Sequence, residues 1–136
     1  MRVLFWFCHR FNWQPAQQTL PDAADAESAR YTNCVAAFVH VEPGDVLAGS
    51  GTETKLVKTA KWLARKWDVT TVILHSFTHL GDEKAAPDEA QALLLRAGAR
   101  LTKAGYQSVH TPYGYFLDLD IQAPGHPLAR VYKAFP

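Results

Sequence analysis

The segment Leu74-His75-Ser76-Phe77-Thr78-His79-Leu80 follows an apolar, β-branched run, Val69–Leu74, which predicts a buried strand. It is the first of three short segments with histidine or glycine that lie at the ends of apolar runs. The other two are Thr111-Pro112-Tyr113-Gly114-Tyr115-Phe116 and Gly125-His126-Pro127-Leu128-Ala129. Because a scaffold holds such loop residues in place, these three segments are the first candidates for a functional site.

Two amphipathic helices are predicted on either side of the first segment. The stripe before it has the spacing of one helical face and consists of Leu56, Val57, Ala60, Leu63, Ala64 and Trp67. The stripe after it consists of Ala90, Leu93, Leu94, Ala97 and Leu101. Pro87 suits the first turn of this second helix, and Gly105 is a fitting stop.

The N-terminal part of the chain predicts two strands. Val3–Cys8 is a continuous apolar and aromatic run, and Tyr31–Val41 ends at the turn residues Glu42-Pro43-Gly44-Asp45. Between them, Phe11–Ala29 turns polar and contains two prolines. We therefore expect a long connection there, with room for a short helix.

The C-terminal part predicts two more strands, Tyr106–His110 and Tyr115–Ala123, joined as a hairpin around Pro112-Tyr113-Gly114. Pro127–Lys133 is expected to form one or two helical turns. The order of elements is then β–β–α–β–α–β–β, which predicts an α/β fold with helices covering a mixed β-sheet. The length predicts a single domain over residues 1–136.

Composition limits the classes of function. A formal net charge of +1 provides no global field for nucleic acid, so any RNA contact must come from local patches. Cys8 and Cys34 lie in apolar runs and are expected to be buried thiols, rather than a disulfide or a metal pair. The apolar N-terminal run is too short for a membrane helix and lacks a signal-peptide pattern, so we expect a cytoplasmic protein without a membrane partner.

The order strand–HSFTHL, helix, strand–PYGYF, strand–GHPLA resembles the editing domain of archaeal threonyl-tRNA synthetases, which has the D-aminoacyl-tRNA deacylase-like fold. The similarity extends from Met1-Arg2-Val3-Leu4 through Ala37-Phe38-Val39-His40-Val41-Glu42 to Gly125-His126-Pro127. This resemblance implies an ester hydrolase that removes a wrong amino acid from the 3′ end of a tRNA. It also implies a homodimer.

The resemblance places residues of all three segments in one aminoacyl pocket. His79 matches the histidine of the family's strand–AHL segment, which lines that pocket, whereas His75 is expected to pack or hydrogen-bond at the rim of the sheet. The other residues expected in the substrate pocket are Thr78, Tyr113, Gly114, Tyr115 and His126. Without the resemblance, a lone histidine in the place of His79 is more often structural than catalytic.

The resemblance marks four positions as catalytic. One is His79, and at the other three this chain departs from the polar residues of the family. The family continues its aromatic–glycine–aromatic segment with tyrosine and lysine, whereas this chain has Phe116 and Leu117. A tyrosine hydroxyl and a lysine ammonium can stabilise a developing oxyanion, but phenylalanine and leucine offer neither donor nor charge. The acidic residue after GHPLA is replaced by Arg130, which could restore a positive charge near the place of the missing lysine.

Other groups of residues in the sequence give weaker indications of function. The histidines contain no recognised closely spaced ligand pair such as HExxH, so no metal site and no cofactor is expected. Asp118 and Asp120 alternate with apolar residues and are expected on the solvated face of a strand. The first predicted helix carries basic residues opposite its apolar stripe. This face is either a solvated surface or a tRNA phosphate contact through Lys58, Lys61 and Arg65, which would make binding salt-sensitive.

Three functions follow as alternatives. The leading one is a freestanding domain that acts in trans and deacylates a mischarged aminoacyl-tRNA, with serine attached to threonine tRNA as the substrate implied by the resemblance. The second is a catalytically silent module with the same fold that binds tRNA or protein. The third is a deacylase of changed amino-acid specificity. The apolar replacements Phe116 and Leu117, together with Arg130, leave it open whether the chain is an enzyme.

Overall fold

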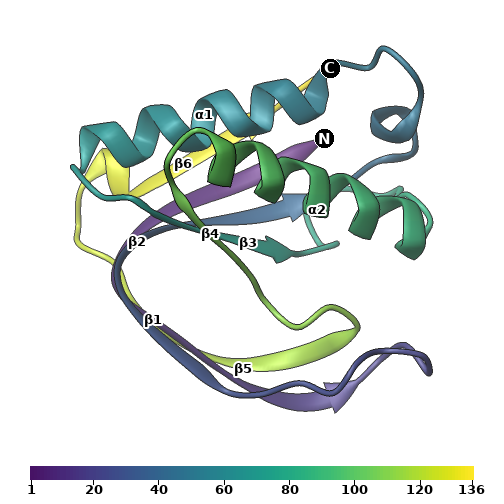
Figure 1. Cartoon of the computed structure of the whole chain (residues 1–136), viewed down its shortest axis with the longest axis horizontal. Coiled ribbons are helices and arrows are strands. Elements are labelled where there is room, and N and C mark those ends of the chain that lie inside the picture. The colour runs from purple at the N-terminus through teal and green to yellow at the C-terminus, as the bar shows by residue number, and fades with distance from the viewer.

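The sheet is mixed and carries both α-helices on one face, as a computed structural model of all 136 residues shows (Figure 1). Its strands are β1 Arg2–Gln18, β2 Ala29–His40, β3 Thr71–Ser76, β4 Gln107–His110, β5 Tyr115–Gln122 and β6 Arg130–Ala134. The helices are α1 Thr52–Lys66 and α2 Pro87–Lys103, and short 3-10 turns lie at Pro43–Val46 and Pro127–Ala129. The spatial order is β4-β3-β2-β1-β5, with β6 also paired to β1. The predicted α/β fold is confirmed.

β1 is much longer than the sequence predicted, because it continues through half of the expected connection Phe11–Ala29. It pairs antiparallel with β2 over Arg2–Trp13 and with β5 over Arg10–Gln18. The polar residues of this stretch thus gain backbone partners that no local pattern reveals. Pro15 is tolerated because the register with β5 shifts between Pro15 and Gln17, at a bulge.

The predicted hairpin between Tyr106–His110 and Tyr115–Ala123 is wrong. β4 pairs in parallel with β3, whereas β5 pairs antiparallel with β1 on the other side of the sheet. The segment Thr111–Gly114 therefore crosses from one edge of the sheet toward the other. The C-terminal prediction is correct only for the first turn, because Arg130–Ala134 forms β6 along the beginning of β1.

Alternating side chains of the strands form a core on each face of the sheet. Val3, Val35 and Leu74 belong to the large core beneath the two helices, whose apolar stripes are buried as predicted except for Trp67, which is half-buried and follows the last residue of α1. A smaller core on the other face consists of Cys8, Phe11, Trp13, Cys34, Ala36, Phe38 and Ile73. Cys8 and Cys34 lie opposite each other across β1 and β2 and are buried free thiols, as expected. Neither helix is long and apolar enough to cross a membrane.

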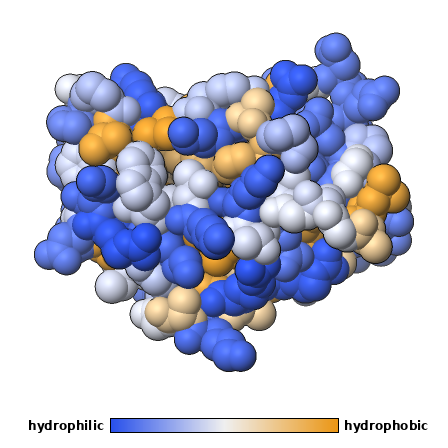
Figure 2. All heavy atoms as spheres, turned by 90° about the horizontal axis from the view of Figure 1, so that it is seen from above, coloured by the Kyte–Doolittle hydropathy of each residue, from blue (hydrophilic) through white to orange (hydrophobic).

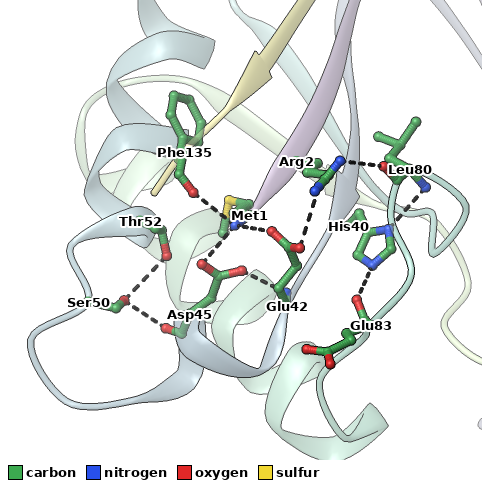
Figure 3. Close-up of polar contacts among 10 residues, drawn as sticks. All are labelled: Met1, Arg2, His40, Glu42, Asp45, Ser50, Thr52, Leu80, Glu83 and Phe135. Carbon is green, nitrogen blue, oxygen red and sulfur yellow. Dashed lines mark hydrogen bonds and ion pairs between the residues drawn. The ribbon is translucent and has the colours of Figure 1, made fainter.

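The α-ammonium of Met1 is buried in a cluster that joins both ends of the chain (Figure 3). It donates to Glu42 Oε1 at 2.8 Å, to Asp45 Oδ1 at 2.9 Å and to the carbonyl of Phe135 at 3.1 Å. Asp45 also accepts the backbone N–H of Glu42, at 2.7 Å. Two carboxylates and a carbonyl thus compensate a charge that would be costly to bury alone. The cluster ties the start of β1 to the turn after β2 and to the chain after β6.

Replacing Asp45 with Asn should destabilise the fold, because the Met1 ammonium would lose the more deeply buried of its two carboxylate partners. Breaking a buried ion pair by removing one partner costs about 3 kcal/mol. Urea unfolding followed by circular dichroism measures this difference. The matched control is Asp118→Asn, since Asp118 is exposed on β5 and makes no ion pair; its effect should stay within about 0.5 kcal/mol. Equal stability of the two variants would contradict the structural role of Asp45.

The same cluster predicts sensitivity to acid. The hydrogen bond from the Met1 ammonium, supported by the charges of Met1 and Arg2, holds the pKa of Glu42 below its ordinary value of 4.5. The unfolded chain therefore binds a proton at this position at a higher pH than the folded chain. The stabilisation by Glu42 is complete above pH 4.5 and is lost as the pH falls through the lowered pKa.

The measurement compares the free energy of unfolding of Glu42→Gln with that of the native chain. The native chain should be more stable at about pH 7, and the gap should narrow at about pH 3. Glu27→Gln removes an exposed carboxylate that makes no ion pair, and it should show no such gap. A gap for Glu42→Gln that stays constant with pH would refute this prediction.

Candidate functional site

Two of the three segments meet at one cavity, at the C-terminal end of β3. Its volume is ≈ 340 Å³, and its walls come from the end of β3, the loop that follows it, the start of α2, the segment Thr111–Gly114 and the start of β5. The rings of His79 and Phe116 stack with their centroids 6.5 Å apart and their planes 17° from parallel. The ends of strands in α/β sheets are where ligands commonly bind. The structure thus brings His79 and the Tyr113–Phe116 loop together.

Most of the residues that the sequence placed in a pocket lie at this cavity. Those that line it are Thr78, His79, Tyr113, Gly114, Tyr115, Phe116 and Leu117. His126 and Arg130 do not line it. The reason is that β6, with the turn before it, lies beside the first residues of β1, Arg2–Trp6. β5, which lines the cavity, pairs instead with Arg10–Gln18 at the other end of β1.

The GHPLA segment has its own local packing, near the end of α1. The imidazole of His126 packs edge-on against Trp67 at 5.3 Å, and its Nδ1 accepts the N–H of Leu128 at 3.0 Å. Arg130 donates to the carbonyl of Pro124 at 2.8 Å and lies over the ring of Trp6, 5.6 Å from its centroid. Within the chain, Arg130 therefore does not bring a positive charge to Leu117.

The loop that carries His79 is anchored by a fully buried histidine, His40, at the end of β2 (Figure 3). The N–H of Leu80 donates to His40 Nδ1 at 3.0 Å, and His40 Nε2 lies 2.6 Å from the carbonyl of Glu83. Since a backbone N–H can only donate and a carbonyl can only accept, these bonds fit the tautomer with its proton on Nε2. Arg2 donates to the carbonyl of Leu80 at 3.3 Å, so this residue is held from both sides.

Gly114 is required by its backbone and by its neighbours. Its φ is +88°, which side chains rarely tolerate, and a Cβ here would lie 2.8 Å from the Cβ of Ala23. The carbonyl of Gly114 accepts the N–H of Thr19 at 2.7 Å, and the hydroxyl of Tyr115 donates to the carbonyl of Ala24 at 2.9 Å. The close approach that the glycine permits is therefore that of the chain after β1, whose Thr19 and Leu20 close one side of the cavity.

A second histidine reaches the cavity, and sequence reasoning missed it as a site residue. His75 is buried, and its Nδ1 lies 2.8 Å from the hydroxyl oxygen of Thr111. This agrees with the expectation that His75 packs or hydrogen-bonds at the rim of the sheet. Both residues also line the cavity. Burial lowers the pKa of His75 to about 4, so the imidazole is neutral near pH 7. The only feature of the sequence that could have indicated this role is that His75 lies four residues before His79 in the same segment.

The cavity is poor in charge. No aspartate or glutamate lines it, and Lys84 is its only lysine or arginine. Burial raises the pKa of Tyr113, whose hydroxyl donates to the carbonyl of Pro87 at 2.7 Å. The backbone N–H groups of Thr78 and His79 make no hydrogen bond within the chain. The lining residues therefore offer hydrogen-bonding side chains and include two residues with unpaired backbone N–H groups, but they offer no acidic general base.

The basic residues that the sequence singled out lie on α1. Lys58 and Arg65 are exposed and Lys61 is half-buried, and none of the three forms an ion pair. The acidic residue of α1, Glu53, pairs instead with Arg96 and Arg100 of α2. Seen from above the helical layer, hydrophilic side chains cover most of this face and apolar ones form only scattered groups (Figure 2).

Comparison with known proteins gives the family. Residues 1–135 match the family described as the archaea-specific editing domain of threonyl-tRNA synthetase. The threonine–tRNA ligase of Pyrobaculum aerophilum is 28% identical over 99% of this chain, and that of Nanoarchaeum equitans is 29% identical over 98%. The matched part is only 22% and 21% of the two ligases, so the chain spans about a fifth of their length.

A solved structure supports the fold independently of sequence. The c-Myc DNA unwinding element binding protein superposes with a TM-score of 0.67 over 100% of this chain and 99% of its own, at 10% identity. Its low identity means that this likeness concerns the fold alone. With the family match over nearly every residue, the conclusion is that this chain belongs to the archaeal threonyl-tRNA synthetase editing-domain family.

Proposed function

We propose that this domain hydrolyses the ester of a mischarged aminoacyl-tRNA, with serine attached to threonine tRNA as the first candidate substrate. The observation that carries the proposal is the cavity shared by His79 and the Tyr113–Phe116 loop, in a chain of the editing-domain family. Its volume of ≈ 340 Å³ is in the range of sites for small ligands. The relatives are named as threonine–tRNA ligases, which supports a tRNA as the carrier of the substrate.

In the proposed reaction, water adds to the ester carbonyl carbon and gives up a proton. The bond between that carbon and the ribose oxygen then breaks, and the ribose oxygen takes up a proton, which releases the amino acid and uncharged tRNA. Catalysis here requires chiefly a positioned water and donors for the oxyanion. The free N–H groups of Thr78 and His79 are suitable donors, and they need no side chain at Phe116 or Leu117.

The apolar side chains of Phe116 and Leu117 favour two alternatives. One is a catalytically silent module that binds tRNA or protein, and the other is a deacylase for a different amino acid. A panel of tRNAs charged with different amino acids separates the three cases. Release of serine supports the main proposal, release of another amino acid supports changed specificity, and tRNA binding without any release supports the silent module.

The proposal includes action in trans, on tRNA charged by a separate synthetase in the cytoplasm. Adding the 136-residue chain to tRNA mischarged by a separate enzyme tests this. We also propose a homodimer, which fits the exposed ring of Tyr132 on β6, and sedimentation equilibrium measures its mass.

Restoring the polar groups of the family tests the catalytic part. The double change Phe116→Tyr and Leu117→Lys should accelerate release of serine from threonine tRNA by roughly 10²–10³, the usual value of one oxyanion donor. Phe116 is 54% exposed, so a hydroxyl can be added there without burying it. Single-turnover deacylation measures the rate. The control Leu47→Lys adds the same charge on an exposed loop and should not accelerate the reaction.

The outcome against an enzyme is specific. If neither the native chain nor the double variant cleaves any aminoacyl-tRNA of the panel, while both remain folded and bind tRNA, the silent module is the correct function. A lysine built into a half-buried leucine position can also be misplaced. The single variant Phe116→Tyr is therefore measured beside the double one.

A second test concerns the unpaired basic face of α1. α1 lies on the helical face of the sheet, away from β5, so this face would contact the body of the tRNA rather than its 3′ end (Figure 1). Replacing Lys58, Lys61 and Arg65 together with Ala should weaken binding similarly for different tRNAs. It should also flatten the plot of log affinity against log salt by roughly 0.9 for each lost phosphate contact.

Filter binding or fluorescence anisotropy at several salt concentrations measures this slope. The control is Lys103→Ala, which removes an exposed lysine at the end of α2 that makes no ion pair. An unchanged slope in the triple variant would mean that the basic face of α1 is only a solvated surface.

A further inference from the structure

We infer that His75 binds the side-chain hydroxyl of the aminoacyl group and makes the cavity selective for hydroxyl-bearing amino acids, while Thr111 holds its imidazole in position. This inference rests on the proposed deacylase function and names a specificity-determining residue of the same cavity. His75 is distinct from His79, which stacks on Phe116 at the exposed side of the site.

The imidazole of His75 is held in one orientation. It lies on the face of β3 that carries the smaller core, where its ring packs edge-on against Phe38 at 4.8 Å and lies 6.2 Å from Phe77. Its Nδ1 lies 2.8 Å from the hydroxyl oxygen of Thr111, whose own N–H donates to the carbonyl of Leu74. Two aromatic rings and one hydrogen bond therefore fix where the other ring nitrogen lies.

That other nitrogen, Nε2, is free to bind a ligand. No group of the protein bonds it, and it is not among the buried polar atoms that are closed off from solvent without a partner. Since His75 is only 8% exposed and lines the cavity, this nitrogen is accessible from the cavity. A polar atom in such a largely apolar place gains much from a partner and loses much without one.

The chemistry of the cavity selects the kind of group that His75 binds. If the hydroxyl of Thr111 donates to Nδ1, then Nε2 carries the proton and donates; if Nδ1 donates, then Nε2 accepts. A hydroxyl can pair with either form, because it both donates and accepts. An ammonium can only donate, and it would find no carboxylate among the lining residues. A side-chain hydroxyl is therefore the best match.

A general-base role fits His75 less well. Its burial favours the neutral imidazole and makes it a weak base near pH 7, whereas a base works best with a pKa near the operating pH. A fixed, neutral hydrogen-bonding group suits recognition instead. Sites that bind a substrate hydroxyl reject the analogue that lacks it, because their polar atoms are then left unpaired. The imidazole itself does not separate serine from threonine, since both carry the hydroxyl.

The test uses two non-hydrolysable probes that differ by one oxygen. They are 3′-amino-3′-deoxyadenosine carrying amide-linked serine and the same compound carrying alanine. Isothermal titration calorimetry should show that the native chain binds the seryl amide about tenfold more tightly, as expected for one net hydrogen bond. His75→Phe should abolish this ratio by weakening the seryl amide, with the alanyl amide unchanged.

Two further variants separate positioning from general damage. Thr111→Val has nearly the same shape but cannot hydrogen-bond Nδ1, so it should reduce the ratio of the two affinities. Thr32→Val makes the same replacement on an exposed part of β2, outside the cavity, and should keep the ratio. Thermal melting of every variant checks that it is folded.

A measurement on the native chain does not depend on any variant. The ¹⁵N NMR signal of His75 Nε2 should shift with the seryl amide and stay in place with the alanyl amide. Equal affinities of the native chain for both probes, or an unchanged ratio in His75→Phe, would overturn the role of His75 while leaving the proposed deacylase intact. Failure of both probes to bind at all would remove the proposed function and this inference together.

Discussion

The pairing of β1 along both of its edges is the constraint on which the rest of the structure depends. One edge carries β2, and the other carries β6 over Arg2–Trp6 and then β5 over Arg10–Gln18. Long paired strands twist and coil, and the bulge after Pro15 adds to the bend. Figure 1 shows β1 and β2 curving together, with β5 on the lower limb of the curve. Phe116, at the start of β5, lies against His79 of the loop after β3.

The cavity owes its shape to contacts between segments far apart in the chain. His40 and Arg2 hold the loop at Leu80, so the first and second strands position the residue beside His79. The carbonyl of Gly114 accepts the N–H of Thr19, so the end of β1 positions the loop before β5. The buried Met1 ammonium ties these strands to the turn after β2 (Figure 3). A site held this way can place neutral groups accurately, which is what ester hydrolysis without a charged base would need.

The three positions at which the family resemblance led us to expect polar side chains do not form one group. Phe116 and Leu117, at the start of β5, line the cavity with apolar side chains, and Arg130 lies outside the cavity over Trp6. The cavity is lined by one lysine, Lys84, by two histidines and by several hydroxyl groups, and no aspartate or glutamate lines it. Recognition by hydrogen bonds and catalysis by backbone donors are compatible with such a surface. Catalysis by a carboxylate of this cavity is not.

Local patterns in the sequence determined the two helices, most of the buried strands and the need for glycine at position 114, whereas the choice of His79 as a site residue came from the family resemblance. Apolar periodicity and backbone requirements act over a few residues, so they can be read from the chain directly. Only the tertiary structure decided that Phe11–Gln18 is a strand, that β5 pairs with β1 rather than with β4, and that Arg130 lies far from Leu117. It also decided that His75 lines the cavity and hydrogen-bonds Thr111 there. The physical reason is that strand partners and cavity walls come from residues distant in sequence, and no local propensity encodes which of them will meet.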